Sequence, residues 1–143
     1  MIGDGVELNN LSKRCETSGI KDRVFFEGKL SYEDSMRKLV SADIVIMPGV
    51  KEGWPKVVIE GWAVGAVPLV AEAGISSFII KDGVNGFLFK PEPAALKNRL
   101  IDIFNDLHSI SGIRNTGWEE VEHFSLEEFS SGIEDVCRNK LNL

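Results

Sequence analysis

The sequence has few of the residues that build metal centres and disulfide frameworks: two cysteines and two histidines in 143 residues. Cys15 and Cys137 stand apart from each other and from any histidine cluster, so we expect free thiols in a reducing compartment. Basic residues are also in the minority: the sequence has 16 lysines and arginines but 22 aspartates and glutamates. The net charge of −6 argues against the basic surface that binding to nucleic acid or an anionic membrane needs.

Long apolar runs and low-complexity linkers are missing as well. No apolar run approaches the ~18 residues of a membrane span, and the first residues lack the pattern of a secretory signal. We therefore expect a cytoplasmic protein, at most peripheral to a membrane as part of a longer enzyme. The hydrophobic content of 43% and the charged content of 27% are ordinary for a globular domain. Residues 1–143 have the length of about one domain.

Short apolar runs alternate with helical patterns along the chain. We expect strands at residues 23–27, 43–47, 67–71 and 87–89, the second of them central. Helices are expected at residues 6–17, 31–40, 55–64, 77–81, 93–108 and 118–124, and after residue 125. Strands that are continuous apolar runs are typical of a parallel sheet covered on both faces. The fold class is therefore α/β, a Rossmann-like parallel sheet with helices on both faces.

The first five residues have the pattern of a strand end followed by a glycine turn, with the body of the strand absent. A natural domain seldom begins in this way. Our hypothesis is that the first strand is truncated and that the chain is part of a longer protein.

The stretch from Pro48 to Glu60 follows the apolar run at residues 44–47 and passes through a glycine loop directly into a helix. Pro55 is favoured at the first helical position. A strand, a glycine loop and a helix N-terminus in this order form anion sites in α/β proteins. The amides expected to hold a diphosphate are those of Gly53, Trp54, Lys56 and Val57.

Two carboxylates flank this anion site. Glu60 lies about a turn and a half inside the helix, where the ribose of a helix-bound diphosphate is expected. Glu52 lies at the loop tip, where the far end of the ligand is expected. A carboxylate binds a cis-diol through charge-assisted hydrogen bonds of roughly 1.5–3 kcal/mol each. The pattern favours a sugar nucleotide; the alternative is that both are plain surface carboxylates.

Three nearby side chains also have two interpretations each. Lys56 is either a point charge for a phosphate or a solvated surface lysine. Trp54, at the junction of loop and helix, fits stacking on a ligand and packing equally well. Trp62 lies among apolar neighbours, and we expect it in the core or at a domain interface.

The run from Glu52 to Pro68 resembles the E-x7-E signature of group 1 (family 4) glycosyltransferases. These are retaining enzymes of GT-B architecture, in which two Rossmann-like domains face each other across a cleft. The similarity extends to residues 3–5, 23–28, 82–88 and 124–126. It covers nearly the whole chain, as the C-terminal, donor-binding domain only.

The resemblance implies that Glu60 binds the nucleotide ribose and that Glu52 contacts the donor sugar near the reacting centre, as the catalytic residue. The backbone at residues 53–57 would hold the diphosphate, and the turn with Gly3 and Gly5 is counted with the donor site. No metal or cofactor is implied; a nucleoside-diphosphate sugar is the substrate. The acceptor would be bound mainly by a missing N-terminal domain.

This sequence departs from the family pattern at two places. Gly49 stands where the family commonly has serine, which removes a local hydrogen bond. Residues 73–78 replace the usual Gly-Gly-x-Pro-Glu loop and lack its glutamate. The family's basic diphosphate-binding pair would lie upstream of Gly3, so we expect this chain to be inactive alone and to bind nucleotides at millimolar concentrations or more weakly.

The resemblance also implies that the helical tail, residues 111–143, crosses to the missing domain. Without that partner its apolar side chains would be exposed, and the chain could self-associate. We therefore predict the donor half of a glycosyltransferase that acts on hexosyl-type sugar nucleotides. The alternatives are a GT-B sugar-nucleotide epimerase and a non-catalytic Rossmann-like ligand-binding or interaction module.

Overall fold

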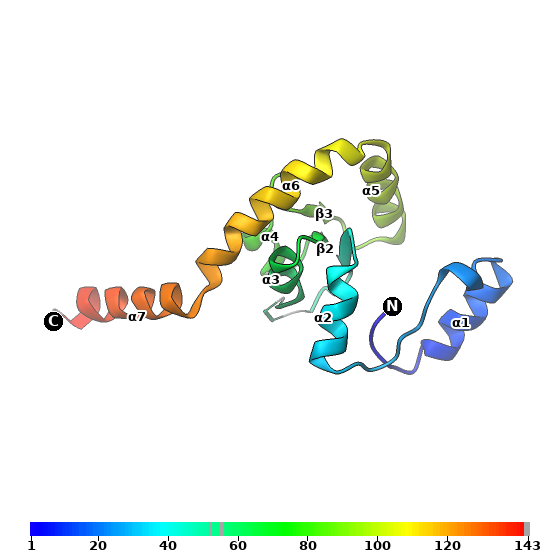
Figure 1. Ribbon diagram of the computed structural model, residues 1–143, viewed down its shortest axis with the longest axis horizontal. Coiled ribbons are helices and arrows are strands. Elements are labelled where there is room, and N and C mark those ends of the chain that lie inside the picture. Colours follow the sequence, from blue (N-terminus) through cyan, green and yellow to red (C-terminus); the bar gives the residue numbers. More distant parts are fainter. Residues whose placement is uncertain (52, 55, 142–143) are drawn as a thin grey trace. The chain divides into compact units, whose positions relative to one another are not determined.

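The computed structural model describes residues 1–51, 53–54 and 56–141 (Figure 1). The chain falls into two compact units, Met1–Lys38 and Leu39–Leu143. In chain order the helices and strands are α1 (Leu8–Thr17), η1 (Lys21–Arg23), α2 (Tyr32–Val40), β1 (Ile44–Met47), α3 (Lys56–Ala63), β2 (Val67–Ala71), α4 (Ser76–Ile79), β3 (Phe87–Phe89), α5 (Pro93–Asn105), α6 (Leu107–Glu120), η2 (Val121–Phe124) and α7 (Leu126–Leu141).

The first unit contains α1, η1 and most of α2. The run Ser31-Tyr32-Glu33-Asp34 resembles a capping box, which predicts a cap at the start of α2. The cap is confirmed, because the N–H of Asp34 donates to the hydroxyl oxygen of Ser31 at 3.1 Å. The same hydroxyl donates to the Asp34 carboxylate at 2.8 Å. The spacing of Met36, Leu39 and Val40 predicts that these side chains point inward from this helix. Leu39 is buried, but Val40 is 63% exposed, so the prediction is wrong for Val40.

The strand predicted at residues 23–27 does not form as a regular element. Residues 25–28 make three backbone hydrogen bonds to the first residues of the chain. Met1 donates to Phe25 O at 2.5 Å, Glu27 donates to Met1 O at 2.9 Å, and Gly3 donates to Gly28 O at 2.8 Å. A regular parallel ladder would take the third bond to Glu27 O, so the register slips by one residue. Gly28, with φ +66°, then turns the chain away.

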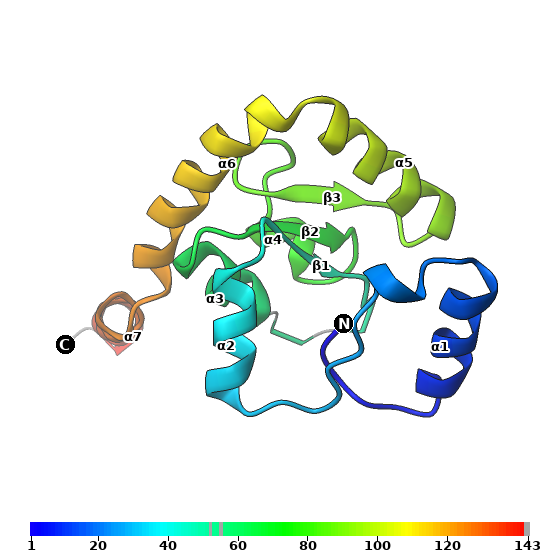
Figure 2. The ribbon, with the colours of Figure 1, turned by 45° about the vertical axis from the view of Figure 1, so that its right-hand side comes forward.

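The second unit has a three-stranded parallel sheet in the order β1-β2-β3 (Figure 2). Helix α3 connects β1 to β2, and α4 connects β2 to β3. Strands β2 and β3 have the predicted bounds. Pro68 is tolerated in the central strand because it precedes the β3 pairing, which begins at Leu69. The predicted Rossmann-like α/β fold is confirmed.

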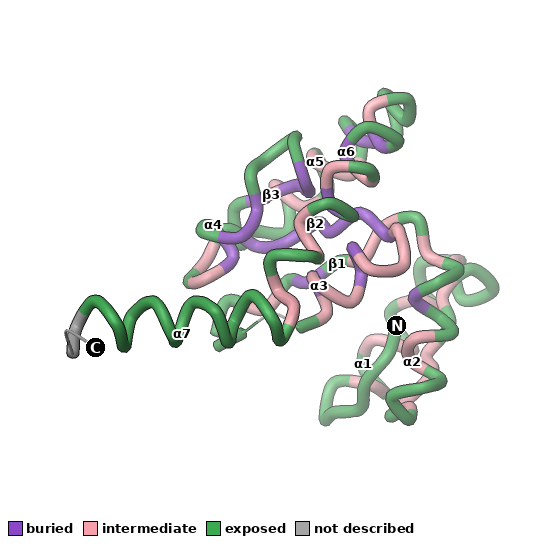
Figure 3. Tube along the Cα trace, turned by 60° about the vertical axis from the view of Figure 1, so that its left-hand side comes forward, coloured by how far each residue is buried: buried purple, intermediate pink, exposed green. Residues whose placement is uncertain are grey.

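Alternating residues of β2 face two separate clusters of apolar side chains, as the period of two in a strand requires. Val67, Leu69 and Ala71 belong to the cluster that includes α5 and α6. Val70 belongs to the other cluster, formed with α3, α4 and η2. Helices therefore cover both faces of the sheet, and the buried segments concentrate on β2 and its neighbours (Figure 3).

The prediction that the strand after Asp43 is the central one is wrong. Within the described chain β1 is an edge strand, and Ile46 is 42% exposed. An apolar run of this length is typical of a buried strand, but it does not reveal which strand lies in the middle. The fully buried strand is β2.

The long helix predicted at residues 93–108 is two helices. Asp106, with φ −131° and ψ 65°, leaves the helical region and separates α5 from α6. A single helix would place Leu96, Leu100, Ile103, Phe104 and Leu107 in one apolar stripe. Ile103 is buried, whereas Phe104 and Leu107 beside the break are 63% and 55% exposed. The predicted helix at 118–124 is the end of α6 followed by the 3₁₀ turn η2.

Helix α6 packs tightly against the core at Gly117. A Cβ atom at this position would lie 2.4 Å from Cδ1 of Trp62. Ile110 and Ile113 of the same helix are buried. Residues 111–117 of the predicted tail are therefore part of the domain, and the crossing to another domain stays a prediction for α7.

We expect Gly117→Ala to lower the free energy of unfolding by about 1–3 kcal/mol, because the added methyl group overlaps the Trp62 ring. Gly112→Ala is the matched control on the same helix, where a Cβ would meet nothing within 4 Å. This control should stabilise the protein by about 0.5–1 kcal/mol, since alanine favours a helix interior. Urea unfolding of both variants measures the difference, and equal effects would contradict this packing.

Helix α7 leaves its apolar residues exposed: Phe129 is 68% exposed, Ile133 49% and Val136 59%. We therefore expect concentration-dependent self-association through this helix. Sedimentation should give a mean mass that rises with concentration, and less steeply for Phe129→Glu. A strict monomer at millimolar concentration would contradict the prediction.

Candidate functional site

The candidate site is the segment from the end of β1 to the middle of α3. Parallel α/β sheets bind ligands at the carboxyl ends of their strands, which is where this segment starts. Gly53 is exposed and Trp54 is 51% exposed. The predicted catalytic residue Glu52 and the helix-starting Pro55 lie outside the described residues.

One of the four predicted amide donors is already engaged. The N–H of Lys56 donates to Trp54 O at 2.9 Å. The first N–H groups of a helix have no acceptor inside the helix, and here the carbonyl of the preceding loop takes one of them. The predicted part of the Lys56 amide in holding a diphosphate stays a prediction. The Lys56 side chain is exposed and forms no ion pair with another described residue.

Glu60 lies in the second turn of α3 and is half-buried. It follows Lys56 by four residues, so the two share one face of the helix. At 1.5 Å per residue, the Cα atom of Glu60 is set back about 6 Å along the axis from the helix start, and its side chain leans toward that end. This offset suits a ligand whose phosphates lie at the helix start and whose hydroxyl groups lie beside the first turn.

Helix α3 is held firmly on the sheet by its other face. Val58 is fully buried and Trp62 is 1% exposed, and the Trp62 indole N–H donates to Asn85 O at 2.7 Å. Gly61 lets the helix approach β1, because a Cβ there would lie 2.9 Å from a methyl group of Val45. The prediction that Trp62 belongs to the core is confirmed.

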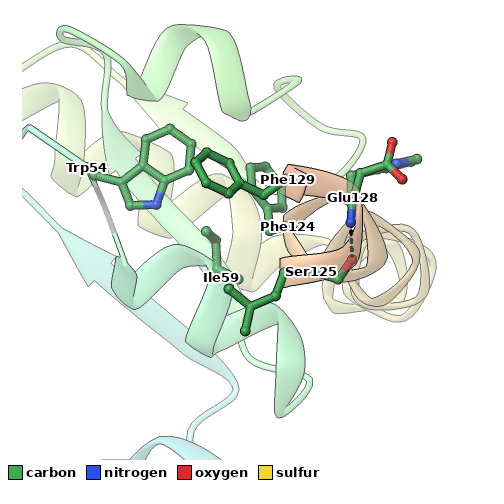
Figure 4. Close-up of a pocket in the computed structure, with 8 residues that line it drawn as sticks. Trp54, Ile59, Phe124, Ser125, Glu128 and Phe129 are labelled. Atoms are coloured by element: carbon green, nitrogen blue, oxygen red, sulfur yellow. Dashed lines mark hydrogen bonds between the residues drawn. The ribbon is translucent and has the colours of Figure 1, made fainter. Parts of the chain in front are cut away.

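Trp54 packs against the protein. Its ring centroid lies 5.8 Å from that of Phe124, with an interplanar angle of 59°. The two rings line a hollow of about 510 Å³ beside the first turns of α3 and α7 (Figure 4). The lining residues are Trp54, Ile59, His123, Phe124, Ser125, Leu126, Glu128 and Phe129.

Sequence reasoning missed this hollow. The aromatic residues at 54 and 124 were visible, but nothing in the sequence indicates that two residues 70 positions apart are in contact.

The side chain of Ser76, which is 2% exposed, holds the backbone of the loop after β2 through hydrogen bonds. Its hydroxyl lies 2.7 Å from Ala71 O, 2.6 Å from Ala73 O and 3.2 Å from the N–H of Ala73. Glu72, which sequence reasoning did not single out, places an exposed carboxylate at the carboxyl end of β2.

Gly3 and Gly5 belong to the unit Met1–Lys38, and their N–H groups both have partners there. Gly3 donates to Gly28 O at 2.8 Å, and Gly5 donates to the carboxylate of Asp4 at 2.8 Å. Gly3 has φ +122°, which favours glycine. Their predicted part in the donor site stays a prediction.

Across the described residues, no three His, Cys, Asp or Glu side chains gather as metal ligands would. Within the same residues, no helix combines the length and the apolarity needed to cross a bilayer.

The chain is similar in sequence to known glycosyltransferases. An uncharacterised glycosyltransferase of Methanocaldococcus jannaschii is 26% identical over 140 residues, which are 95% of this chain and 39% of that protein. A D-inositol 3-phosphate glycosyltransferase of Streptomyces scabiei is 25% identical over 140 residues, covering 92% of this chain and 31% of that protein. The chain therefore spans about a third of the length of these relatives.

The crystal structure of Anabaena HepE in complex with UDP superposes with a TM-score of 0.83 at 23% identity. It covers 94% of this chain and 38% of HepE, so the two share a fold. The family model described as Glycosyl transferases group 1 matches residues 1–115. Because this match takes in well over half of the sequence, the chain belongs to the group 1 glycosyl transferases.

Proposed function

We propose that this chain is the nucleotide-sugar-binding domain of a retaining glycosyltransferase, which moves a hexosyl group from a nucleoside diphosphate to an acceptor. The observation that supports it most is the half-buried Glu60 one turn inside α3, a helix that starts at the carboxyl edge of the sheet. The superposable HepE structures contain UDP or UDP-glucose, which supports a donor of the same chemical class.

The proposed chemistry depends mainly on electrostatics. The partial positive charge at the start of α3 contributes about 0.3–2 kcal/mol to binding an anion. It would also stabilise the negative charge that develops on the departing diphosphate. In this proposal Glu60 binds the ribose hydroxyls, and Glu52 positions the donor sugar. No step requires a metal ion.

The rest of the enzyme would supply the acceptor site and the basic diphosphate-binding pair. Two charge-assisted bonds at Glu60 and the helix start give about 5 kcal/mol of gross interaction, of which association entropy cancels at least ~4 kcal/mol. This chain alone is then expected to bind nucleotides at millimolar concentrations or more weakly, without turnover.

Its two cysteines are free thiols, which supports a reducing, cytoplasmic location.

The test is an NMR titration of the ¹⁵N-labelled chain with UDP, GDP and ADP. The proposal predicts that at least one nucleotide shifts the amides of Gly53, Trp54, Lys56 and Val57. The non-catalytic scaffold alternative predicts no shifts there with any of the three. An epimerase would also shift these amides, and product analysis of the full-length enzyme with donor alone separates it from a transferase.

A further inference from the structure

Phe124 joins the candidate donor loop to the core. Its ring centroid lies 5.8 Å from that of Trp54 and 6.0 Å from that of Trp62. Trp62 is 1% exposed and belongs to the core, whereas Trp54 is 51% exposed and lies in the loop just before α3. Phe124 therefore lies between a fixed tryptophan and an exposed one.

The backbone around Phe124 is fixed on both sides. The N–H of Ser125 donates to Glu122 O at 3.1 Å, which closes η2. The hydroxyl oxygen of Ser125 accepts the N–H of Glu128 at 3.1 Å, which caps α7 (dashed line, Figure 4). Phe124 itself packs against the cluster that contains Trp62. Phe124 is thus the anchored member of the pair with Trp54.

We propose that Phe124 is a positioning residue, which holds Trp54 and with it the neighbouring amides in the conformation that binds the donor diphosphate. This inference depends on the proposed function, because it concerns the same site. Trp54 directly follows Gly53, and its carbonyl accepts the N–H of Lys56. A ring that holds Trp54 therefore also restrains Gly53 and the N–H of Lys56.

The size of the effect follows from the energy of one aromatic contact. An aromatic pair contributes about 0.5–1.5 kcal/mol beyond the area it buries. Losing it lowers the population of the binding-competent loop, and the apparent Kd rises by the inverse of that population. Phe124→Leu should therefore raise the Kd for the best-bound nucleotide by about two- to twelvefold. Phe124→Tyr, which keeps the ring, should restore the affinity.

Phe129→Leu is the matched control. Phe129 lines the same hollow, but among the described residues it makes no ring contact with Trp54. The Phe129→Leu variant should bind nucleotide with the same Kd as the unmodified chain. The Trp62 indole N–H resonance reports in every variant that the core is folded. If Phe124→Leu loses this resonance, Trp54→Leu takes its place, because it leaves the Trp62–Phe124 contact intact. Trp54→Leu must then show the same loss of nucleotide affinity, and Trp54→Phe must recover that affinity.

The experiment compares NMR spectra without ligand and then titrates the best-bound of UDP, GDP and ADP. The proposal predicts that Phe124→Leu shifts the Trp54 indole N–H resonance and broadens the amides of Gly53 and Lys56 before any nucleotide is added. It also predicts the weaker Kd, which Phe124→Tyr restores. Equal affinities of Phe124→Leu and the unmodified chain would overturn this inference and leave the proposed function intact. Failure of the unmodified chain to bind any nucleotide would overturn the proposed function, and this inference with it.

Discussion

Asn85→Ala is expected to lower the free energy of unfolding by about 2–4 kcal/mol. Asn85 is fully buried, and its side-chain oxygen accepts the N–H of Lys81 at 2.8 Å. Its side-chain N–H groups donate to Ile79 O at 3.1 Å and to the Glu120 carboxylate at 3.2 Å. The substitution removes this partner from the buried Ile79 O and from the part-buried N–H of Lys81, at about 1–3 kcal/mol for each unsatisfied group. It also removes one of two links between the turn before β3 and α6, the other being the ion pair of Lys81 with Glu120.

Urea unfolding followed by fluorescence measures this loss. Asn115→Ala, on the exposed side of α6, is the matched control and should change stability by no more than about 0.5 kcal/mol. The Trp62 indole donates to the backbone oxygen of Asn85, so a shift of its resonance in Asn85→Ala would show that the turn has moved. Equal stabilities of the two variants would contradict the structural role of this turn.

Glu60→Ala is expected to weaken nucleotide binding by at least about tenfold. The proposed bonds from the Glu60 carboxylate to the ribose hydroxyls are charge-assisted, and each contributes roughly 1.5–3 kcal/mol. A loss of 1.4 kcal/mol raises the Kd tenfold. From a millimolar starting point, the weaker binding of this variant is compared through the initial slope of the shifts against nucleotide concentration.

The amides of residues 53–57 provide the measurement. Glu119→Ala removes the same charge from an exposed position on α6 and serves as the control for net charge. The control should bind nucleotide like the unmodified chain. If Glu60→Ala keeps the shifts at residues 53–57 with unchanged midpoints, the carboxylate has no part in binding.

Features that depend on neighbours in the sequence were predictable. The bounds of β2 and β3, the cap at Ser31 and the helix start near residue 56 all follow from turn residues and apolar runs. Features that depend on distant contacts were not. The sequence gives no sign that β1 lies at an edge or that residues 25–28 slip in register against the first residues of the chain.

The break at Asp106 shows the limit of periodicity as a guide. Leu100, Ile103 and Leu107 continue one helical pattern across it, yet the backbone at Asp106 is not helical. Residues of α5 and α6 join the same core cluster on one face of the sheet, and the change in direction lets both helices pack there.

In the candidate site, too, some features could be predicted from neighbouring residues and others could not. Glu60 and the start of α3 could be read from the sequence because they belong to one short segment. The hydrogen bond of the Lys56 amide within the loop and the packing of Trp54 on Phe124 could not, since each depends on backbone geometry or on a residue 70 positions away.

The central claim is that Glu60 binds the ribose of a nucleotide whose phosphates lie at the start of α3. The most direct test compares the best-bound nucleoside diphosphate with its 2′-deoxy analogue, on the unmodified chain and on Glu60→Ala. The unmodified chain should prefer the ribonucleotide by about tenfold, the value of one charge-assisted hydrogen bond. Glu60→Ala should bind both forms equally. The same preference in both proteins would contradict the claim.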